Sequence, residues 1–216
     1  MSRVTDRKFR CMKCNEIYGI TTYDSVNVTI DPDIKERCLS GDIFHFECPH
    51  CHNSYMLSYP CLYHDQENKF MVWLYEDEKV IDAFESSFIE QLISLGYTLR
   101  RCTDMNSFIE KIQILDDGLD DRAVEFAKYD SFVDYIENKK RDPKEIEGIY
   151  YHGIDNDVLK INIRTIDKGA TIMIPYEALL EEINNHKDLF GIDDENFPVI
   201  DSRWIIQIFE ANQNIS

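Results

Sequence analysis

The sequences Cys11-Met-Lys-Cys14 and Cys48-Pro-His-Cys51 decide what can be predicted about the fold of this chain. A Cys-x2-Cys motif forms a tight turn that directs two thiolates to one side, and two such turns supply the four sulfur ligands of a tetrahedral zinc site. The 33 residues between the motifs exceed the roughly 15–20 of compact zinc ribbons, but they contain a predicted strand and helix that can return the chain to the first turn. We therefore predict one structural zinc ion per chain, bound by Cys11, Cys14, Cys48 and Cys51.

Three other interpretations of the motifs stay open. Redox-active or buried cysteine turns have the same spacing. A catalytic zinc site is disfavoured, because four thiolates leave no coordination position for a water molecule. The residue after the second cysteine of a zinc-binding turn is usually glycine, since the backbone there is left-handed; Asn15 tolerates this conformation and His52 tolerates it less well. His50 and His52 flank Cys51, so either histidine could replace a cysteine as a ligand.

The charge of the chain is strongly negative and unevenly distributed. The 216 residues carry a formal net charge of −18, with 8 basic and 10 acidic residues in 1–75 but 15 basic and 31 acidic residues in 76–216. Such a surface repels phosphate, so nucleic acid is not an expected partner. We expect a basic protein partner instead, bound to the acidic C-terminal part near residues 116–122 and the last two predicted helices.

The remaining cysteines and the N-terminal residues help to predict the cellular compartment of the protein. Seven cysteines is an odd number, and Cys38, Cys61 and Cys102 lie outside the motifs beside apolar neighbours, so we expect them to be buried. The N-terminal residues do not resemble a signal peptide, and no apolar run approaches the roughly 18–20 residues of a membrane span. We expect a cytoplasmic protein that does not bind membranes; the sequence does not predict its oligomeric state.

Residue patterns predict an α+β protein whose sequence composition changes near residue 76. The first part, 1–76, is expected to be an enlarged zinc-ribbon sheet, and the second, 77–216, an acidic part made of helices and a small antiparallel meander. In the first part, strands are predicted at 17–30, 42–47, 54–61 and 69–75, a helix at 33–39 and a polar turn at 63–68. In the second part, helices are predicted at 82–94, 104–115, 119–140, 175–186 and 202–212, and strands at 96–102, 148–153, 157–166 and 170–174.

An ordered set of short sequences resembles the CpXC domain proteins of bacteria and archaea. Besides the two cysteine motifs, the resemblance rests on Val26-Asn-Val-Thr-Ile-Asp-Pro32, Leu39-Ser-Gly41, Tyr59-Pro-Cys-Leu-Tyr-His-Asp65, Phe70-Met-Val-Trp73, Glu110-Lys-Ile112 and Asp116-Asp-Gly-Leu-Asp-Asp-Arg122. It covers roughly residues 8–135. The first motif here lacks the proline of the family's Cys-Pro-x-Cys, and His52 replaces its usual glycine. The resemblance supports metal binding and implies nothing about an activity.

These observations favour a non-enzymatic zinc-binding protein that acts through protein–protein contacts, with a regulatory role. One alternative is a nucleic-acid-associated zinc ribbon that uses the basic N-terminal cluster of Arg3, Arg7, Lys8, Arg10 and Lys13. Another is an enzyme with an unrecognised site. His64-Asp65 could serve acid–base chemistry, although a polar turn explains it equally well. The run 116–122 resembles a calcium loop only loosely, and the end of one helix and the start of the next account for it better.

Overall fold

The computed structural model describes residues 2–77, 86–192 and 197–213, and it confirms the α+β class. The chain divides into two compact units. Unit 1 comprises Met1–Ile112 with Glu195–Pro198, and unit 2 comprises Gln113–Asp194 with Val199–Ser216. The units divide at residue 112, within helix α3 (Met105–Asp116), whereas the change in sequence composition lies near residue 76.

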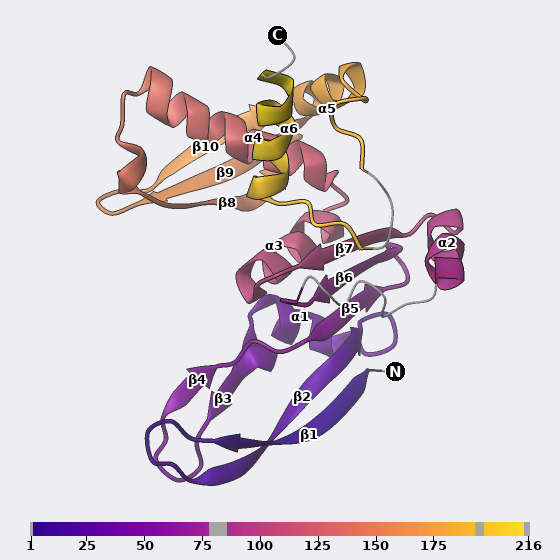
Figure 1. Cartoon of the computed structure of the whole chain (residues 1–216), viewed down its shortest axis with the longest axis vertical. Helices are drawn as coiled ribbons and strands as arrows, with labels where there is room; N and C mark the ends of the chain where they lie inside the picture. The colour runs from indigo at the N-terminus through magenta and orange to yellow at the C-terminus, as the bar shows by residue number, and fades with distance from the viewer. Residues whose placement is uncertain (1, 78–85, 193–196, 214–216) are drawn as a thin grey trace. The chain divides into compact units, whose positions relative to one another are not determined.

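Within the described residues, unit 1 contains a mixed five-stranded sheet in the order β1-β2-β5-β6-β7 (Figure 1). The pairs β1–β2 and β5–β6 are antiparallel, and the pairs β2–β5 and β6–β7 are parallel. Two further short strands, β3 and β4, pair with each other in an antiparallel hairpin. The bounds are Arg3–Arg10 for β1, Ile17–Asn27 for β2, His45–Glu47 for β3, Ser54–Met56 for β4, Cys61–Asp65 for β5, Phe70–Leu74 for β6 and Thr98–Cys102 for β7.

The predicted helix at 33–39 is confirmed as α1 (Asp33–Leu39). Pro32 precedes its first residue, and Gly41 follows with a left-handed φ of 77°, which glycine adopts without strain. Ile34 and Cys38 are four residues apart and are both buried, so they form the inward face of the helix. The second helix of unit 1, α2, spans Ser86–Ser94; residues 82–85 of the predicted helix lie outside the described part of the chain.

Three predictions for the first part were wrong in detail. Residues 42–44 form a 3-10 turn and not a strand: Gly41 begins the turn with a left-handed φ of 77°, and the amide of Phe44 donates back to the carbonyl of Gly41 at 3.0 Å. The strand expected at 54–61 ends at Met56. The polar turn expected at 63–68 begins later, because Tyr63, His64 and Asp65 belong to β5. Asp65 closes the actual turn by accepting hydrogen bonds from the amides of Glu67 and Asn68, both at 3.0 Å.

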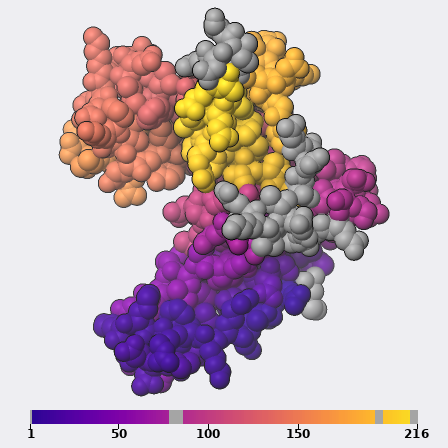
Figure 2. All heavy atoms as spheres, viewed as in Figure 1, coloured from indigo at the N-terminus to yellow at the C-terminus, as the bar shows by residue number. Residues whose placement is uncertain are grey.

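Strand β1 was not predicted at all. Its charged side chains were interpreted only as a basic cluster, and its exposed residues do not alternate with buried ones. It pairs along its whole length with β2, from Arg3 opposite Ser25 to Arg10 opposite Ile17. In the space-filling view the indigo atoms of these N-terminal strands lie at the surface (Figure 2).

Unit 2 contains the predicted meander, which is confirmed. Its three strands among the described residues are β8 (Ile146–Asp155), β9 (Val158–Thr165) and β10 (Ala170–Pro175), paired antiparallel in the order β10-β9-β8. The turn between β8 and β9 places Asn156 and Asp157 at φ 48° and 60°. The helices of this unit are α4 (Asp121–Val133), which continues into a π-helical turn at Asp134–Asn138, α5 (Tyr176–Asn185) and α6 (Ser202–Gln213).

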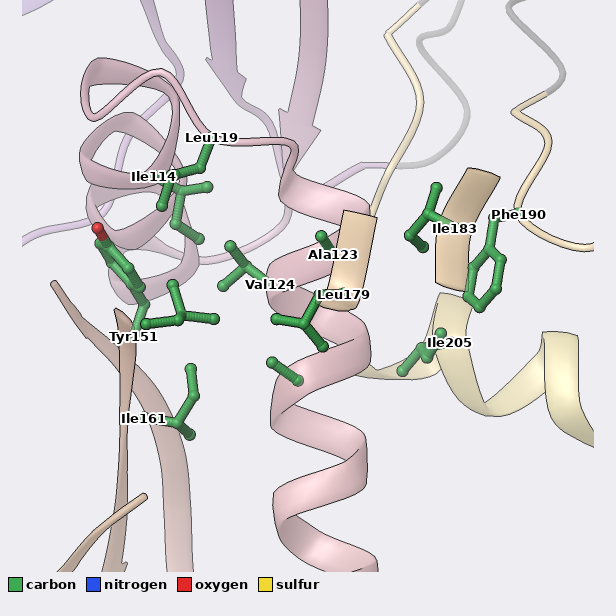
Figure 3. Packing of buried hydrophobic residues seen from close by; sticks show 12 residues of the cluster. Ile114, Leu119, Ala123, Val124, Tyr151, Ile161, Leu179, Ile183, Phe190 and Ile205 are labelled. Carbon is green, nitrogen blue, oxygen red and sulfur yellow. The ribbon is translucent and has the colours of Figure 1, made fainter. Parts of the chain in front are cut away.

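Helices and meander of unit 2 share one apolar core (Figure 3). Figure 3 shows side chains of the sheet, of α4 and of the two C-terminal helices converging on the same space. The buried members labelled there are Ile114, Leu119, Ala123, Val124, Tyr151, Ile161, Leu179, Ile183, Phe190 and Ile205. Because these residues come from both ends of the unit's sequence, the core joins α3, α4, the meander, α5 and α6.

The acidic run 116–122 ends α3 and starts α4. Asp117 accepts a hydrogen bond from the Tyr151 hydroxyl, and Asp120 is the N-cap of α4, accepting from the Arg122 amide at 3.0 Å. The backbone amide of Asp120 donates to the Tyr176 hydroxyl at 2.7 Å, and the Asp121 side chain is 1% exposed. The structural interpretation of this run is therefore confirmed, and its side chains contact other residues of the chain.

Candidate metal centre

The structure brings the four predicted cysteines together. Cys11 and Cys14 lie in the connection between β1 and β2, and Cys48 and Cys51 lie in the connection between β3 and β4. All four sulfur atoms lie within 4.8 Å of one another, so this group could hold a metal ion. The sulfur of Cys11 lies 3.6 Å from that of Cys51, and the sulfur of Cys14 lies 3.7 Å from that of Cys48.

These distances fit a metal centre better than disulfides. A disulfide requires a sulfur–sulfur distance of about 2.0 Å, and all four cysteines are free. Four sulfurs bonded at about 2.3 Å to a tetrahedral zinc ion would stand about 3.8 Å apart. Two of the four sulfur–sulfur distances between the motifs, 3.6 and 3.7 Å, therefore match the edges of such a tetrahedron.

The two motifs have the same backbone conformation. In each, the amide of the first cysteine donates to the carbonyl five residues later, and the residue after the second cysteine donates its amide back to the first cysteine's carbonyl. The residues after the second cysteines are left-handed, as their position predicts: φ is 62° at Asn15 and 54° at His52. The bonds are Cys11 to Glu16 (2.9 Å), Asn15 to Cys11 (2.9 Å), Cys48 to Asn53 (3.0 Å) and His52 to Cys48 (2.9 Å).

The first cysteine of each motif is fully buried, at 0% exposure, and the second is half-buried. Three aromatic rings pack beside the cluster. Phe9 contacts both Tyr18 and Tyr55 edge-on, with ring centroids 5.7 and 5.5 Å apart. The cysteine charges also help to raise the pKa of Tyr18, after burial, which is the larger cause. Phe9 therefore joins a ring of its own hairpin to a ring of the β3–β4 hairpin.

One contact of the cluster was not predicted from the sequence. The Tyr55 hydroxyl lies 3.0 Å from the sulfur of Cys11 and accepts a hydrogen bond from the amide of Lys13 at 3.1 Å. Tyr55 belongs to β4, whereas Cys11 and Lys13 belong to the connection between β1 and β2. No local pattern marks this tyrosine, because it lies beside the sulfur only when the β3–β4 connection and the β1–β2 connection meet in the fold.

Hydrogen bonds set the electrostatics of the thiols. Burial alone would raise the pKa of Cys11, but hydrogen bonds from Tyr55 and from the amides of Cys14 and Lys13 outweigh it and lower this pKa to about 6. A backbone hydrogen bond lowers the pKa of Cys14, but burial and the neighbouring sulfurs together raise it to about 12. Cys11 therefore loses its proton more readily than Cys14, whose ionisation the neighbouring sulfurs oppose. A cation would relieve this repulsion.

Neither neighbouring histidine belongs to the sulfur group. The Nδ1 atom of His52 lies 2.7 Å from a carboxylate oxygen of Glu47, and its side chain is 78% exposed. His50 is also exposed. Among the described residues that could hold a metal ion, the group at this place consists of Cys11, Cys14, Cys48 and Cys51 alone. A histidine ligand therefore has no support in the geometry.

The three other cysteines are buried, as expected. Cys38 and Cys61 are fully buried and Cys102 nearly so. Burial raises the pKa of Cys38 to about 12, which keeps its thiol neutral at physiological pH.

His64, the candidate acid–base residue, is held in β5 between Asn27 and the Tyr97 hydroxyl, which is 3.2 Å from its Nε2 atom. Burial lowers the pKa of His64, so this imidazole is neutral at pH 7.

The basic N-terminal cluster is partly neutralised within its own hairpin. Asp24 on β2 forms ion pairs with Arg3 at 3.4 Å and with Arg7 at 3.2 Å. The Thr5 hydroxyl and, against the effect of burial, the two guanidinium groups hold the pKa of Asp24 below its usual value. Arg10 donates to the backbone carbonyl of Asn15 at 3.0 Å. These side chains therefore have partners inside the protein.

No helix in the described part of the chain is both long enough and apolar enough to cross a membrane.

Comparisons with curated proteins and with solved structures found no match. The comparison with protein families matched the model described as CpXC protein over residues 9–128, which is more than half of the chain and includes both cysteine motifs. The paired Cys-x2-Cys turns, the strands between and after them and this match together show that the chain belongs to the CpXC family.

Proposed function

We propose that this protein binds one zinc ion at the four cysteines, that the ion has a structural role, and that the protein acts by contact with another protein. One observation carries the metal assignment: four sulfurs from two backbone-equivalent turns lie within 4.8 Å of one another. Thiolate ligands in a tetrahedral arrangement select zinc over calcium, magnesium or manganese, which prefer oxygen ligands. Free cysteines and a thiolate centre fit the reducing cytoplasm.

A structural role follows from the ligand set. Four thiolates fill the coordination sphere of zinc and leave no position for water or substrate. The ion would tie the β1–β2 connection to the β3–β4 connection. Strands β3 and β4 have three residues each, and such a short isolated hairpin is marginal in water without further support. Zinc binding is therefore coupled to the folding of the part of unit 1 that contains the two cysteine motifs.

The enzyme alternative gains no support from the cavities found in the described residues of unit 2. One, of about 560 Å³, lies between the end of α5 and α6 and includes Trp204. The other, of about 420 Å³, lies on the meander. Three of its polar side chains are engaged with one another or with a neighbour: Thr171 donates to Asn162 at 2.7 Å, and Arg164 pairs with Glu147 at 3.1 Å. We propose no reaction at either place.

The role of residue 52 separates a cysteine-only site from one with a histidine ligand. We expect His52→Gly to retain one zinc per chain and to leave the melting temperature unchanged or raised, because glycine removes the strain of the left-handed backbone. His52→Val should lose about 1–2 kcal/mol of unfolding free energy, because a β-branched side chain resists this conformation. Metal analysis and thermal unfolding measure both variants.

The matched control for this pair is Asn53→Gly, which changes the next residue, where the backbone has no positive φ. It should be destabilising, since glycine adds flexibility without relieving strain. Loss of zinc in His52→Gly would contradict a site made of four cysteines and would restore the histidine alternative.

We propose that the partner is basic and binds the exposed face of α5. The side chains in 116–122 are used within the fold, which leaves the C-terminal helices as the better part of the acidic surface. Glu177 and Glu181 stand one helical turn apart and are both exposed, whereas Leu179 and Ile183 face the core. A nucleic-acid partner is not favoured, because the net charge is −18 and Asp24 neutralises part of the basic hairpin.

Charge reversal on α5 tests this surface. The chain is captured on a resin and exposed to extract from its native host, and it should retain a basic protein. The variant Glu177→Lys/Glu181→Lys should retain at least tenfold less of that protein, because charged side chains at the edge of an interface promote association at low salt. Lys139→Glu/Lys140→Glu is the control, with two exposed charges elsewhere in unit 2, and it should retain the partner. Equal retention by both double variants would place the interface elsewhere. Retention of nucleic acid that is lost on changing Arg10 and Lys13 to alanine would favour the alternative function.

A further inference from the structure

Tyr55 is the point at which the second hairpin reaches the first cysteine. It lies in β4 opposite Phe46, and its half-buried ring packs edge-on against Phe9 of β1. Its hydroxyl lies between two groups of the β1–β2 connection, the sulfur of Cys11 at 3.0 Å and the amide nitrogen of Lys13 at 3.1 Å. The ring contact and the two polar contacts together fix the position of the hydroxyl oxygen.

The hydrogens at this place can be assigned from chemistry. A backbone amide can only donate, so the Tyr55 oxygen accepts from Lys13. The hydroxyl hydrogen is then available for the sulfur of Cys11, which lies within hydrogen-bonding distance. A thiolate has no hydrogen of its own, so with a metal-bound Cys11 the bond can run only from oxygen to sulfur. The amide of Cys14 also approaches this sulfur, at 3.4 Å.

We propose that Tyr55 is a positioning residue of the metal centre, whose hydroxyl donates a hydrogen bond to the Cys11 thiolate and thereby strengthens zinc binding. This inference rests on the proposed zinc site. Outer partners of this kind orient the ligand and share its negative charge, and their loss typically costs 10–100-fold in metal affinity. Tyr55 also crosses from one hairpin to the other, so it holds Cys11 in place relative to the motif of Cys48 and Cys51 before metal binds.

The test compares two tyrosine-to-phenylalanine changes in the full chain. Tyr55→Phe removes the hydroxyl and keeps the ring contact with Phe9. Tyr18→Phe is the matched control, because Tyr18 packs on the same Phe9 ring and its buried hydroxyl has no hydrogen-bond partner in the described structure. We expect Tyr55→Phe to bind zinc about 10–100-fold more weakly than the wild type in competition with a chromophoric chelator. Tyr18→Phe should stay within about threefold of the wild type.

A second readout separates the hydrogen bond from packing. Cobalt(II) bound in place of zinc gives a sulfur-to-metal charge-transfer band, and a hydrogen bond to sulfur stabilises the electrons that this transition removes. The band should therefore move to lower energy in Tyr55→Phe and stay in place in Tyr18→Phe. Weaker zinc binding without this shift would assign Tyr55 to hairpin packing and overturn the proposed hydrogen bond.

The remaining outcomes separate this inference from the function on which it rests. If the wild type binds zinc and Tyr55→Phe matches Tyr18→Phe in both affinity and band position, the role of Tyr55 is refuted while the zinc site stands. If the wild type binds neither zinc nor cobalt tightly, the proposed function fails and the inference fails with it.

Discussion

Cys48→Ser is expected to abolish tight zinc binding and to loosen the end of unit 1 that contains the two hairpins. Zinc bound to such sites contributes on the order of 10 kcal/mol at neutral pH, and this energy is available only when both cysteine turns meet. Cys48 is fully buried, and its sulfur lies 3.7 Å from that of Cys14, so a weakly binding serine would leave an incomplete site in the interior. Metal analysis and amide hydrogen exchange over residues 2–77 measure both effects.

Cys38→Ala is the control for the loss of a cysteine as such. Cys38 is as fully buried as Cys48, but it faces inward from α1 and does not belong to the sulfur group. It should keep one zinc per chain and lose about 1 kcal/mol of unfolding free energy. Full zinc content in Cys48→Ser, with protection of the β3–β4 hairpin unchanged, would refute the assignment of Cys48 as a ligand.

Phe190→Ala is expected to give the largest loss of stability in unit 2, about 3–5 kcal/mol. Phe190 is 1% exposed, and its ring contacts Phe126 at 5.5 Å between centroids as well as Trp204 and Phe209. The change leaves a cavity among these rings, which come from α4 and α6 and cannot collapse freely. Because the sulfur group belongs to unit 1, zinc content should not change.

Ile166→Ala serves as the comparison for a change at an exposed apolar position. Ile166 is 68% exposed, so its truncation should alter the unfolding free energy by no more than about 0.5 kcal/mol. Chemical denaturation followed by tryptophan fluorescence, with metal analysis before unfolding, tests both variants. If Phe190→Ala lost its zinc in the native state, the independence of the metal centre from the core of unit 2 would be wrong.

Features with a local cause were predicted well from the sequence. The two cysteine motifs act within four residues each, and the structure brings their sulfurs together. Helix α1 has Pro32 before its first residue and Ser40-Gly41 after its last, and its bounds match the prediction. The meander has polar turns between regular apolar strands, and its three strands were located to within a few residues. In each case the residues that decide the structure are neighbours in the chain.

Features that depend on distant partners were not predicted. Strand β1 has no alternating pattern, because as an edge strand it exposes charged side chains and is defined only by its pairing with β2. His64 was placed in a turn, because the burial of Tyr63 against Phe70 cannot be read from either residue alone. Asp121 was included in an acidic surface, whereas it is buried. Tyr55 was missed for the same reason, since its sulfur contact crosses between two hairpins.

The number and type of metal ligands test the central claim most directly. X-ray absorption at the zinc edge, on protein purified without added metal and quantified by elemental analysis, reports both the metal and its nearest atoms. The four-cysteine site predicts one zinc per chain with four sulfur neighbours at about 2.3 Å. Protein without stoichiometric metal, or zinc with nitrogen or oxygen among its nearest neighbours, would contradict it.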